Sequence, residues 1–301
     1  MKIAAIVVGY FPDETILLNL IRALSAQVTE LILVDNGGSE KTHEIAAQEG
    51  IKLKYINVAP NKGLGYALNA GFIYAESVGA TYVATFDQDS APSSDLITKL
   101  ELSHQKLEAQ GINCAAVGPV FYDRREGEKI YFPFYREENG RIVSKLPGSS
   151  PEELVETDAL ITSGMLVKIK VWAEGTRYDD GLFVDYTETD WCYRVRSKGY
   201  KLYGNLRTDM GHAPSDAPPL RILGLSFFRY SPLRRYYYFR NTVSFCRQPY
   251  VSWAWRRRIL TGLTVRLFVN ALIDTNRIKS VKMMVTGIRD SLRNKTGEYS
   301  K

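Results

Sequence analysis

The sequence contains little cysteine, and its three cysteines are widely separated. Cys114, Cys192 and Cys246 form no pair with the short spacing of a metal-binding ribbon. We therefore expect neither a disulfide framework nor a zinc ribbon. This cysteine usage suits a reducing compartment, and we expect the protein to work in the cytoplasm.

Long hydrophobic runs are missing as well. The apolar stretch over residues 3–8 is followed by a proline and two acids at residues 12–14, before it reaches the length of a signal-peptide core or a membrane helix. A second apolar run, over residues 259–265, is bounded on both sides by arginine. We expect the first run to form a buried strand and neither run to span a bilayer.

Acidic residues are scarce in the last quarter of the chain. Residues 219–301 hold 17 Lys and Arg against three Asp and Glu, a net charge of +14, although the whole chain carries only +6. Residues 1–218 hold 22 basic against 30 acidic residues and are mildly acidic. Prolines at positions 214, 218 and 219 mark the change. We predict a body over residues 1–218 and a basic, aromatic-rich module over residues 219–301.

Apolar runs of strand length alternate with helical patterns in the first 120 residues. Strands are expected at residues 3–9, 31–34, 53–58, 82–86 and 114–120, with helices between them. This order predicts an α/β fold in which helices cover both faces of a mostly parallel sheet. The pattern is lost over residues 121–160 and returns with a strand at 164–169 and a helix at 187–198. The body therefore divides into residues 1–120 and residues 121–218.

Polar side chains follow several of these strands. Asp35, Asn61 and Asp87 fall near strand ends, so the pattern places them along one rim, where a nucleotide-type ligand is expected. Asp87 and Asp89 flank Gln88, and alternate residues of an extended chain present both carboxylates to one side. Such a pair suits Mg²⁺ or Mn²⁺ bound together with substrate phosphates. The position after a buried strand favours this interpretation over a pair of solvated loop acids.

Two further segments are ambiguous on pattern alone. Residues 35–37, Asp-Asn-Gly, are preferred turn residues, and residues 61–65, Asn-Lys-Gly-Leu-Gly, also suit a helix entry. The second segment lacks the Gly-Lys-Ser/Thr ending of a P-loop and the third glycine of a dinucleotide fingerprint. Neither segment identifies a ligand by itself.

Three acids and one histidine in the second half are also candidates. Glu188 and Asp190 fall in the first turn of the expected helix, where the helix dipole favours negative charge for purely structural reasons. With Asp185 they also lie among aromatic residues, where burial raises a carboxylate pKa toward that of a general base. The pattern leaves both roles open. His212 is a lone histidine, which is usually a packing residue, but beside two carboxylates it would complete a Mn²⁺ site.

Taken in order, these segments resemble the inverting family 2 glycosyltransferases, most closely their bacterial rhamnosyltransferase branch. The resemblance covers roughly residues 3–245, and the ordered set is more specific than any single motif. The segments are IVVGY at 6–10, VDNG at 34–37, NKGLG at 61–65, FDQD at 86–89, SGM at 163–165, the acidic block at 183–194 and RYYYFRN at 235–241. The resemblance implies a GT-A fold, a Rossmann-like sheet with a nucleotide-binding first half and an acceptor-binding, catalytic second half.

The resemblance also implies roles for single residues. Asp35 would contact the nucleobase of a nucleotide-sugar, Asp87 the ribose or a metal, and Asp89 the Mg²⁺ or Mn²⁺ on the diphosphate. Some relatives use a histidine after the acidic block as a metal ligand, which adds His212 to Asp87 and Asp89. The donor-binding residues implied are Asp35, Asn61, Lys62, Gly63, Asp87 and Gln88.

The candidate general base departs from the family's acidic motif, which usually reads Glu-Asp-x-Asp/Glu with the Asp of the first pair as base. Aligned on residues 190–192, that position is Glu188, preceded by Thr187. This departure leaves Asp185 and Asp190 as alternative bases. The implied reaction is a single displacement, in which the base takes a proton from an acceptor hydroxyl and the anomeric configuration inverts.

We therefore predict a metal-dependent glycosyltransferase, in particular a rhamnosyltransferase that uses dTDP-L-rhamnose. Its acceptor would be a saccharide or a lipid-linked saccharide in the synthesis of a bacterial surface polysaccharide. One alternative is a family 2 enzyme that transfers another hexose from a UDP donor. The other is a non-catalytic scaffold that binds nucleotide-sugars.

The basic module predicts a partner of its own. Three arginines at 256–258 follow Trp253 and Trp255, and apolar residues recur at helical spacing over residues 259–273. Such an amphipathic helix suits the interface of an anionic membrane, which would place the protein on the inner face of the cell membrane. Packing on the body or in a homodimer is the alternative. We expect no nucleic acid partner, because no nucleic-acid-binding motif is present.

Overall fold

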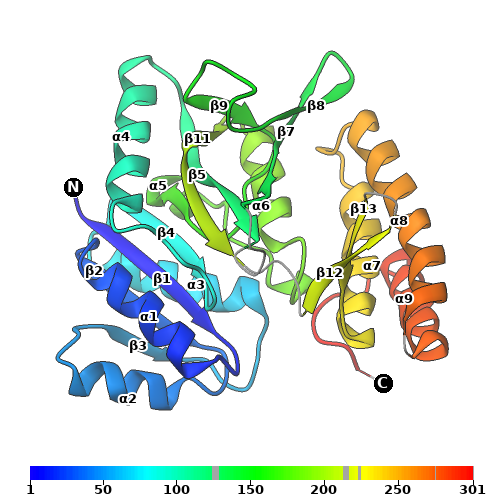
Figure 1. The fold of residues 1–301 in the computed structure, drawn as a ribbon, viewed down its shortest axis with the longest axis horizontal. Coiled ribbons are helices and arrows are strands. Elements are labelled where there is room, and N and C mark those ends of the chain that lie inside the picture. The colour runs from blue at the N-terminus through cyan, green and yellow to red at the C-terminus, as the bar shows by residue number, and fades with distance from the viewer. Residues whose placement is uncertain (124–128, 213–216, 223–224, 275, 301) are drawn as a thin grey trace.

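The computed structural model describes residues 1–123, 129–212, 217–222, 225–274 and 276–300, and in this part a large sheet is flanked by helices on both faces (Figure 1). The strands of the sheet are β1 (Ile3–Gly9), β2 (Glu30–Asp35), β3 (Lys54–Asn57), β4 (Tyr82–Asp87), β5 (Cys114–Asp123), β6 (Tyr131–Phe132), β9 (Leu154–Thr157), β10 (Met165–Lys168) and β11 (Lys201–His212). The flanking helices are α1 (Glu14–Ser25), α2 (Glu40–Gln48), α3 (Leu64–Ser77), α4 (Leu96–Ala109), α5 (Ile169–Ala173) and α6 (Thr187–Ser197), with a 3₁₀ turn at Asp180–Leu182.

The sheet is mostly parallel, as predicted. Its strand order is β3-β2-β1-β4-β10-β5-β11-β9, with β6 paired to β5. β1 runs parallel to β2 and β4, and β11 runs parallel to β5, whereas β10 and β9 are antiparallel to their neighbours. In this register Gly9 pairs with Asp35, and Val8 pairs with Asp87. The two aspartates therefore lie at the same edge of the sheet.

Alternate residues of β1 face opposite cores. Ile6 belongs to a buried cluster with Phe72 of α3 and Trp172 of α5. Val7 belongs to a second cluster with Leu17 of α1. Because the strands are buried on both faces, they read as continuous apolar runs in the sequence.

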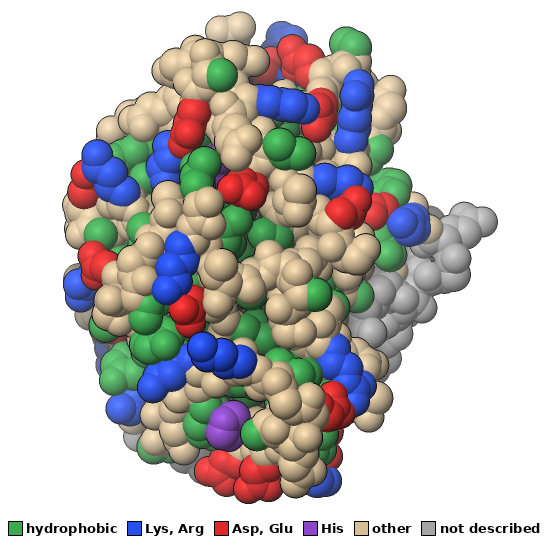
Figure 2. Space-filling model, turned by 90° about the vertical axis from the view of Figure 1, so that its left-hand side faces the viewer, with side chains coloured by type: hydrophobic (Ala, Val, Ile, Leu, Met, Phe, Trp, Pro, Cys, Tyr) green, Lys and Arg blue, Asp and Glu red, His purple; other side chains and the backbone are tan. Residues whose placement is uncertain are grey.

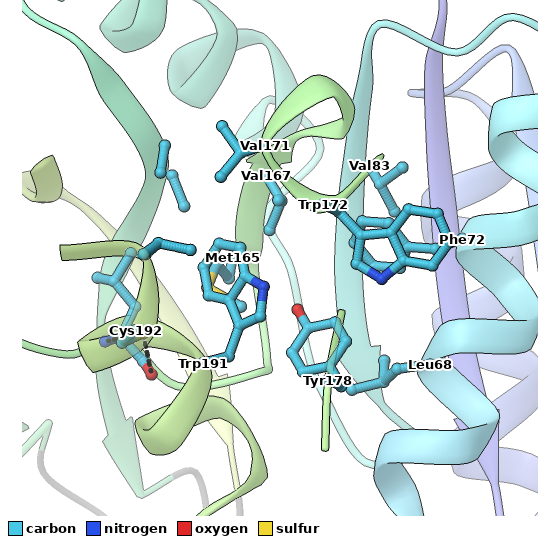
Figure 3. Close-up of a cluster of buried hydrophobic side chains, with 14 of the residues drawn as sticks. Leu68, Phe72, Val83, Met165, Val167, Val171, Trp172, Tyr178, Trp191 and Cys192 are labelled. Atoms are coloured by element: carbon cyan, nitrogen blue, oxygen red, sulfur yellow. Dashed lines mark hydrogen bonds between the residues drawn. The ribbon is translucent and has the colours of Figure 1, made fainter. Parts of the chain in front are cut away.

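Aromatic side chains link α6 to α3 and α5 (Figure 3). Trp172 stacks on Phe72 with ring centroids 5.2 Å apart, and Trp191 of α6 stacks on Tyr178 with centroids 5.6 Å apart. Trp172 and Trp191 are both fully buried. Phe72 also meets Tyr178 edge to face, with ring centroids 5.6 Å apart, so the four rings tie α6 to α3 and α5. α6 carries Glu188 in its first turn.

The predicted irregular segment contains a hairpin of β7 (Phe134–Glu138) and β8 (Arg141–Lys145). A second hairpin, of β12 (Ala217–Ile222) and β13 (Leu225–Arg229), precedes the C-terminal helices. The boundary predicted at residue 218 falls inside β12, so the change in composition does not coincide with the end of an element. The division of the chain into domains stays a prediction.

After the β12–β13 hairpin, the C-terminal module is helical, as predicted, with α7 (Pro232–Cys246), α8 (Trp253–Ile273) and α9 (Arg277–Leu292). Gly287 of α9 lies so close to α7 that an added Cβ would be 2.4 Å from the carbonyl oxygen of Tyr236. Of the helices described here, none is both long and apolar enough to cross a membrane.

Candidate active site

A cleft of about 990 Å³ opens at the carboxyl ends of β1 and β4, between the first half of the body and the C-terminal module. One wall comes from the loops after β1, β2, β3 and β4, and another from the start of α6. A third wall comes from α7 and α8. The residues of the first wall include Tyr10, Asn36, Asn61, Asp87, Gln88 and Asp89, and those of the others include Asp185, Glu188, Arg234, Tyr237, Tyr238 and Trp255. This volume is at the upper end of the range of ligand pockets, about 300–1,000 Å³, and suits a whole nucleotide-sugar.

Asp35 does not line this cleft. Its carboxylate is buried, with one oxygen accepting hydrogen bonds from the backbone N–H of Gly37 (2.8 Å) and Ser39 (3.1 Å). The other oxygen accepts a hydrogen bond from the hydroxyl of Tyr55 at 2.5 Å. Burial and this hydrogen bond raise the pKa of Tyr55. Asp35 therefore shapes the turn after β2, and its neighbour Asn36 is the residue that reaches the cleft.

Asn36 links this turn to the loop at residues 61–65. Its side-chain amide donates a hydrogen bond to Oδ1 of Asn61 at 2.8 Å, and its Oδ1 accepts one from the backbone N–H of Lys62 at 3.0 Å. Asn61 lines the cleft, whereas Lys62 is exposed beside it, with its ammonium 4.7 Å from the ring centroid of Tyr66. The two asparagines thus form one polar corner of the cleft.

Gly63 is required by the packing of two loops. Its φ is +91°, and an added Cβ would be 2.6 Å from the carbonyl oxygen of Phe183. The same oxygen accepts a hydrogen bond from the backbone N–H of Leu64 at 2.6 Å. Gly63 does not line the cleft itself, but it lets the loop at residues 61–65 touch the loop that precedes Glu188.

Asp87, Gln88 and Asp89 all line the cleft. Asp87 accepts a hydrogen bond from the hydroxyl of Ser163 at 2.6 Å, and Gln88 accepts one from the backbone N–H of Tyr10 at 2.6 Å. Ser163 is fully buried, and sequence reasoning gave it no role although it belongs to the matching segment at 163–165. The two carboxylates of residues 87 and 89 suit a Mg²⁺ or Mn²⁺ ion, because such ions are commonly held by one or two carboxylates plus substrate phosphates.

His212 is the last residue of β11, where its backbone pairs with Asp123. Its side chain lies outside the part that the structure describes. Among the described residues, no group of three or more His, Cys, Asp or Glu side chains forms a metal site. Of the three predicted metal ligands, Asp87 and Asp89 are therefore the two whose side chains the structure describes, and their role stays a prediction.

Glu188 faces the same cleft as Asp87. Burial is the main cause that raises the pKa of Glu188 to about 7. The negative charges of Asp87 and Asp185 act in the same direction, and the charge of Arg234 acts against them. A carboxylate with a pKa near neutrality is matched to general-base work at physiological pH.

The structure separates the other two candidate bases. Asp185 lines the cleft, and its Oδ1 lies 3.3 Å from the guanidinium of Arg234. Asp190 does not line the cleft, because one of its oxygens pairs with Arg194 at 2.6 Å and the other accepts a hydrogen bond from Tyr250 at 2.5 Å. Asp190 therefore anchors α6, and the geometry gives no support to Asp190 as the base.

The loop before α6 has an unusual backbone conformation. Phe183, Asp185 and Tyr186 have φ angles of +66°, +60° and +67°, values that non-glycine residues rarely adopt. Two buried side chains of α7 hold the loop. The amide of Asn241 donates hydrogen bonds to the carbonyls of Leu182 (2.8 Å), Val184 (2.7 Å) and Asp185 (3.0 Å), and the guanidinium of Arg240 donates one to the carbonyl of Leu182 (2.8 Å).

The C-terminal tail also reaches the cleft, where Glu298 and Tyr299 line the wall. Arg240 donates a hydrogen bond to the carbonyl of Gly297 at 2.6 Å. The backbone N–H of Tyr299 donates to the hydroxyl of Tyr237 at 2.8 Å. Sequence reasoning missed the tail and Arg234. The segment at 235–241 was the available signal for α7, but nothing in the sequence pointed to the tail.

Comparisons with known proteins show which family and which relative this chain resembles in sequence. Residues 5–151 match the family described as glycosyl transferase family 2. The chain is 28% identical over 304 residues to dTDP-rhamnosyl transferase RfbF of Shigella flexneri, and the alignment covers 98% of this chain and 97% of that protein.

Solved structures resemble it in fold. TarS 1-349 of S. aureus, in complex with UDP-GlcNAc, has a TM-score of 0.55 at 12% identity, with 98% of this chain and 93% of that chain covered. GalNAc-T7, solved with UDP, GalNAc and Mn²⁺, has a TM-score of 0.56 at 13% identity, with 97% and 56% covered. The present chain thus spans little more than half of the GalNAc-T7 chain. By the match over residues 5–151, the similarity to the rhamnosyl transferase and the shape of its sheet, the chain resembles glycosyl transferase family 2 and has a fold of the GT-A type.

Proposed function

We propose that the protein is an inverting rhamnosyltransferase that moves L-rhamnose from dTDP-L-rhamnose to a saccharide or lipid-linked saccharide acceptor of a bacterial surface polysaccharide. The observation that carries the reaction is that Glu188, with a pKa raised to about 7, lines one cleft together with Asp87 and Asp89. The identity of the donor is supported by the near-complete alignment with a dTDP-rhamnosyl transferase.

In this mechanism the donor lies along the first wall of the cleft. Asn36 and Asn61 offer amide groups for hydrogen bonds to the nucleotide. Asp87 and Asp89 would hold Mg²⁺ or Mn²⁺, which neutralises the negative charge of a departing diphosphate. Glu188 accepts the proton of an acceptor hydroxyl, and the oxygen attacks the anomeric carbon as its bond to the diphosphate breaks. Attack from the face opposite the leaving group inverts the configuration.

The substitution Glu188→Gln tests the base. It keeps the shape of the side chain but removes the proton acceptor, so transfer should fall by at least about a thousandfold, within the range for loss of a general base. Binding of dTDP, followed by thermal shift, should change little. Glu76→Gln, on the exposed face of α3, is the matched control. Near-normal turnover by Glu188→Gln would remove Glu188 from this role.

The donor is tested by a panel. Purified protein would be incubated with Mn²⁺ and dTDP-L-rhamnose, UDP-glucose, UDP-galactose or UDP-N-acetylglucosamine, and release of the free nucleotide measured. Turnover of dTDP-L-rhamnose well above the UDP sugars is expected. Preference for a UDP sugar would favour the second donor class, and binding without turnover of any donor would favour a scaffold.

We further propose that α8 and α9 contact an anionic membrane surface. Their outer faces carry large exposed apolar side chains, with Trp253 at 74% and Ile278 at 87% exposure. Arg257 and Arg258 are exposed on the same helix as Trp253. The exposed apolar side chains can enter the headgroup region, and the neighbouring cations attract anionic lipids. This combination suits an anionic membrane better than an uncharged protein surface. A homodimer through the same face is the alternative outcome of its test.

A further inference from the structure

A second cavity of about 240 Å³ adjoins the cleft, and it is called the side pocket below. Glu188, Thr189 and Trp255 line both cavities, as do Phe121, Ala159 and Ile161, so the side pocket opens beside the proposed base. Its other walls come from β5, β6, β7 and the residues before β10. These are Gly118, Pro119, Phe121, Phe132, Pro133, Phe134, Tyr135, Ala159, Leu160 and Ile161.

Aromatic rings form the walls of the side pocket and are held in place. Phe121 and Phe132 are stacked, with ring centroids 4.6 Å apart and planes 8° from parallel. The indole N–H of Trp255 donates a hydrogen bond to the buried carboxylate of Asp158 at 2.5 Å. The ring of Tyr135 meets that of Trp255 edge to face at 6.3 Å.

Polar groups are concentrated at one end of the side pocket. Glu188 and Thr189 belong to the first turn of α6, whereas the remaining lining is mainly aromatic, aliphatic and proline. A ligand that fits must therefore present an apolar face to the rings and a hydroxyl to Glu188. Pyranose rings have this character, because their axial C–H bonds form apolar patches and their hydroxyls project from the edge.

The size of the side pocket limits the ligand further. Its volume is below the range of about 300–1,000 Å³ that accommodates a drug-sized ligand. One sugar ring is therefore a better match than a disaccharide or a polyprenyl chain. The proposed donor would occupy the adjoining cleft of about 990 Å³.

We propose that the side pocket binds the terminal sugar of the acceptor, with one ring face against Phe132 and Tyr135 and the attacking hydroxyl at Glu188. This inference rests on the proposed function, because it assigns the second substrate of the same reaction. It also identifies Phe132 and Tyr135 as residues that determine acceptor affinity without contacting the donor, since neither lines the large cleft.

The experiment uses single-sugar probes with a common tail. Calorimetric titrations of the full chain, saturated with dTDP and Mn²⁺, would use the n-octyl glycosides of L-rhamnose, D-glucose and N-acetyl-D-glucosamine, with 1-octanol as the tail alone. At least one glycoside should bind saturably and 1-octanol should not. Phe132→Ala and Tyr135→Leu should each weaken that binding by roughly tenfold, which corresponds to about 1.4 kcal/mol.

Two further variants separate a binding role from a folding defect. Phe132→Tyr keeps the ring face and should bind like the parent, and Tyr200→Ala, which removes an aromatic ring outside both cavities, should also bind like the parent. Thermal unfolding would confirm that all variants are folded. The proposal is overturned if no glycoside binds, if binding follows the octyl tail alone, or if folded Phe132→Ala and Tyr135→Leu both bind like the parent.

A donor assay in the same variants keeps the two proposals apart. Slow hydrolysis of dTDP-L-rhamnose by water needs only the donor cleft, so the side-pocket variants should retain it. If the parent protein neither binds dTDP nor hydrolyses the donor, the proposed function fails. If donor hydrolysis is normal but the titrations give an overturning result, only the acceptor assignment fails.

Discussion

The proton-accepting role proposed for Glu188, together with its pKa near neutrality, predicts a rate that is sensitive to pH. The ionised form is needed to accept a proton, and the pKa is about 7. Below that pH, kcat/KM should fall about tenfold per unit, whereas a carboxylate of ordinary pKa would keep the rate constant to about pH 5. Rates measured from pH 5 to 9 at a fixed donor concentration test this. A flat profile from pH 5 to 8 would contradict the assignment.

The same shift predicts a stability effect. The pKa is raised from 4.5 in the unfolded chain to about 7 in the fold, so between these values the folded protein holds a proton that the unfolded chain has lost. Stability then decreases as pH rises through this window. Glu188→Gln removes this loss of stability, because its side chain does not titrate. The Tm of the variant minus that of the parent should therefore be larger at pH 8 than at pH 5. An equal difference in Tm at both pH values would show that the carboxylate is not destabilised by its surroundings.

Asp87 and Asp89 predict a metal effect on nucleotide binding. With two carboxylates as protein ligands, the ion and the diphosphate should bind together, so Mn²⁺ should add to the rise in Tm produced by dTDP. Asp87→Asn and Asp89→Asn should remove this addition, and EDTA should remove it from the parent. Glu76→Gln serves again as the control. A Tm shift by dTDP that is the same with EDTA and with Mn²⁺ would argue against the site.

At the level of elements, α7 supports the loop that carries Asp185 and precedes Glu188. Asn241 satisfies three carbonyl groups of that loop with one amide, in a buried position. Without these hydrogen bonds, the loop is less strongly stabilised in its positive-φ conformation. Asn241 is therefore a positioning residue for Glu188.

Replacing Asn241 by Leu should cost about 1–3 kcal/mol of unfolding free energy, because buried carbonyls lose their partner. It should also lower kcat more than it raises the KM for the donor, because it displaces the base. Ser244→Ala on the same helix, where the hydroxyl shares a hydrogen bond with the hydroxyl of Ser291 on α9, is the control. If the two variants lose the same fraction of kcat, Asn241 has no positioning role.

The sequence predicted the elements of the first half well, because β1, β2 and β4 are buried apolar runs and two of them end in an aspartate. Tyr82–Asp87 is one example, and it placed Asp87 and Asp89 at the correct edge of the sheet. The roles of side chains at these ends were harder to predict. Asp35 and Asp190 have the residue type and position expected of a site residue, yet tertiary partners turn both away from the cleft.

Long-range contacts explain the remaining omissions. Ser163 reaches Asp87 across 76 residues of sequence, and Asn241 reaches Asp185 across 56. Neither spacing leaves a periodic signal. The lining of the side pocket likewise comes from separate strands and from α8, so only the fold brings it together.

At the scale of the whole molecule, charge is distributed unevenly. On the face shown in Figure 2, the side on which α1, α2 and α4 lie, Lys and Arg side chains are interspersed with Asp and Glu. The C-terminal quarter, with its net charge of +14, lies at the opposite end in Figure 1. An anionic surface would therefore attract the end formed by α7, α8 and α9 and orient the protein.

A triple substitution tests the membrane contact. Trp253→Ser, Phe268→Ser and Leu272→Ser together remove exposed apolar side chains of α8. Cosedimentation with vesicles of phosphatidylglycerol should be lost, and in the parent it should weaken at high salt. Leu102→Ser, on α4 at the other end, is the control. Unchanged cosedimentation would refute the contact, and conversion of a dimer to a monomer by the triple variant would assign the face to a homodimer.

The return of the tail to the cleft has a practical consequence for handling the protein. The backbone of Tyr299 is hydrogen-bonded to Tyr237 of α7, and Tyr299 lines the cleft. An affinity tag or reporter fused at the C-terminal end would therefore lie near the cleft in which we propose that the substrates bind. A fusion ahead of Met1 would emerge at the amino end of β1, on the opposite edge of the sheet from Asp87. A protein with an N-terminal tag should therefore be more active than the same protein with a C-terminal tag.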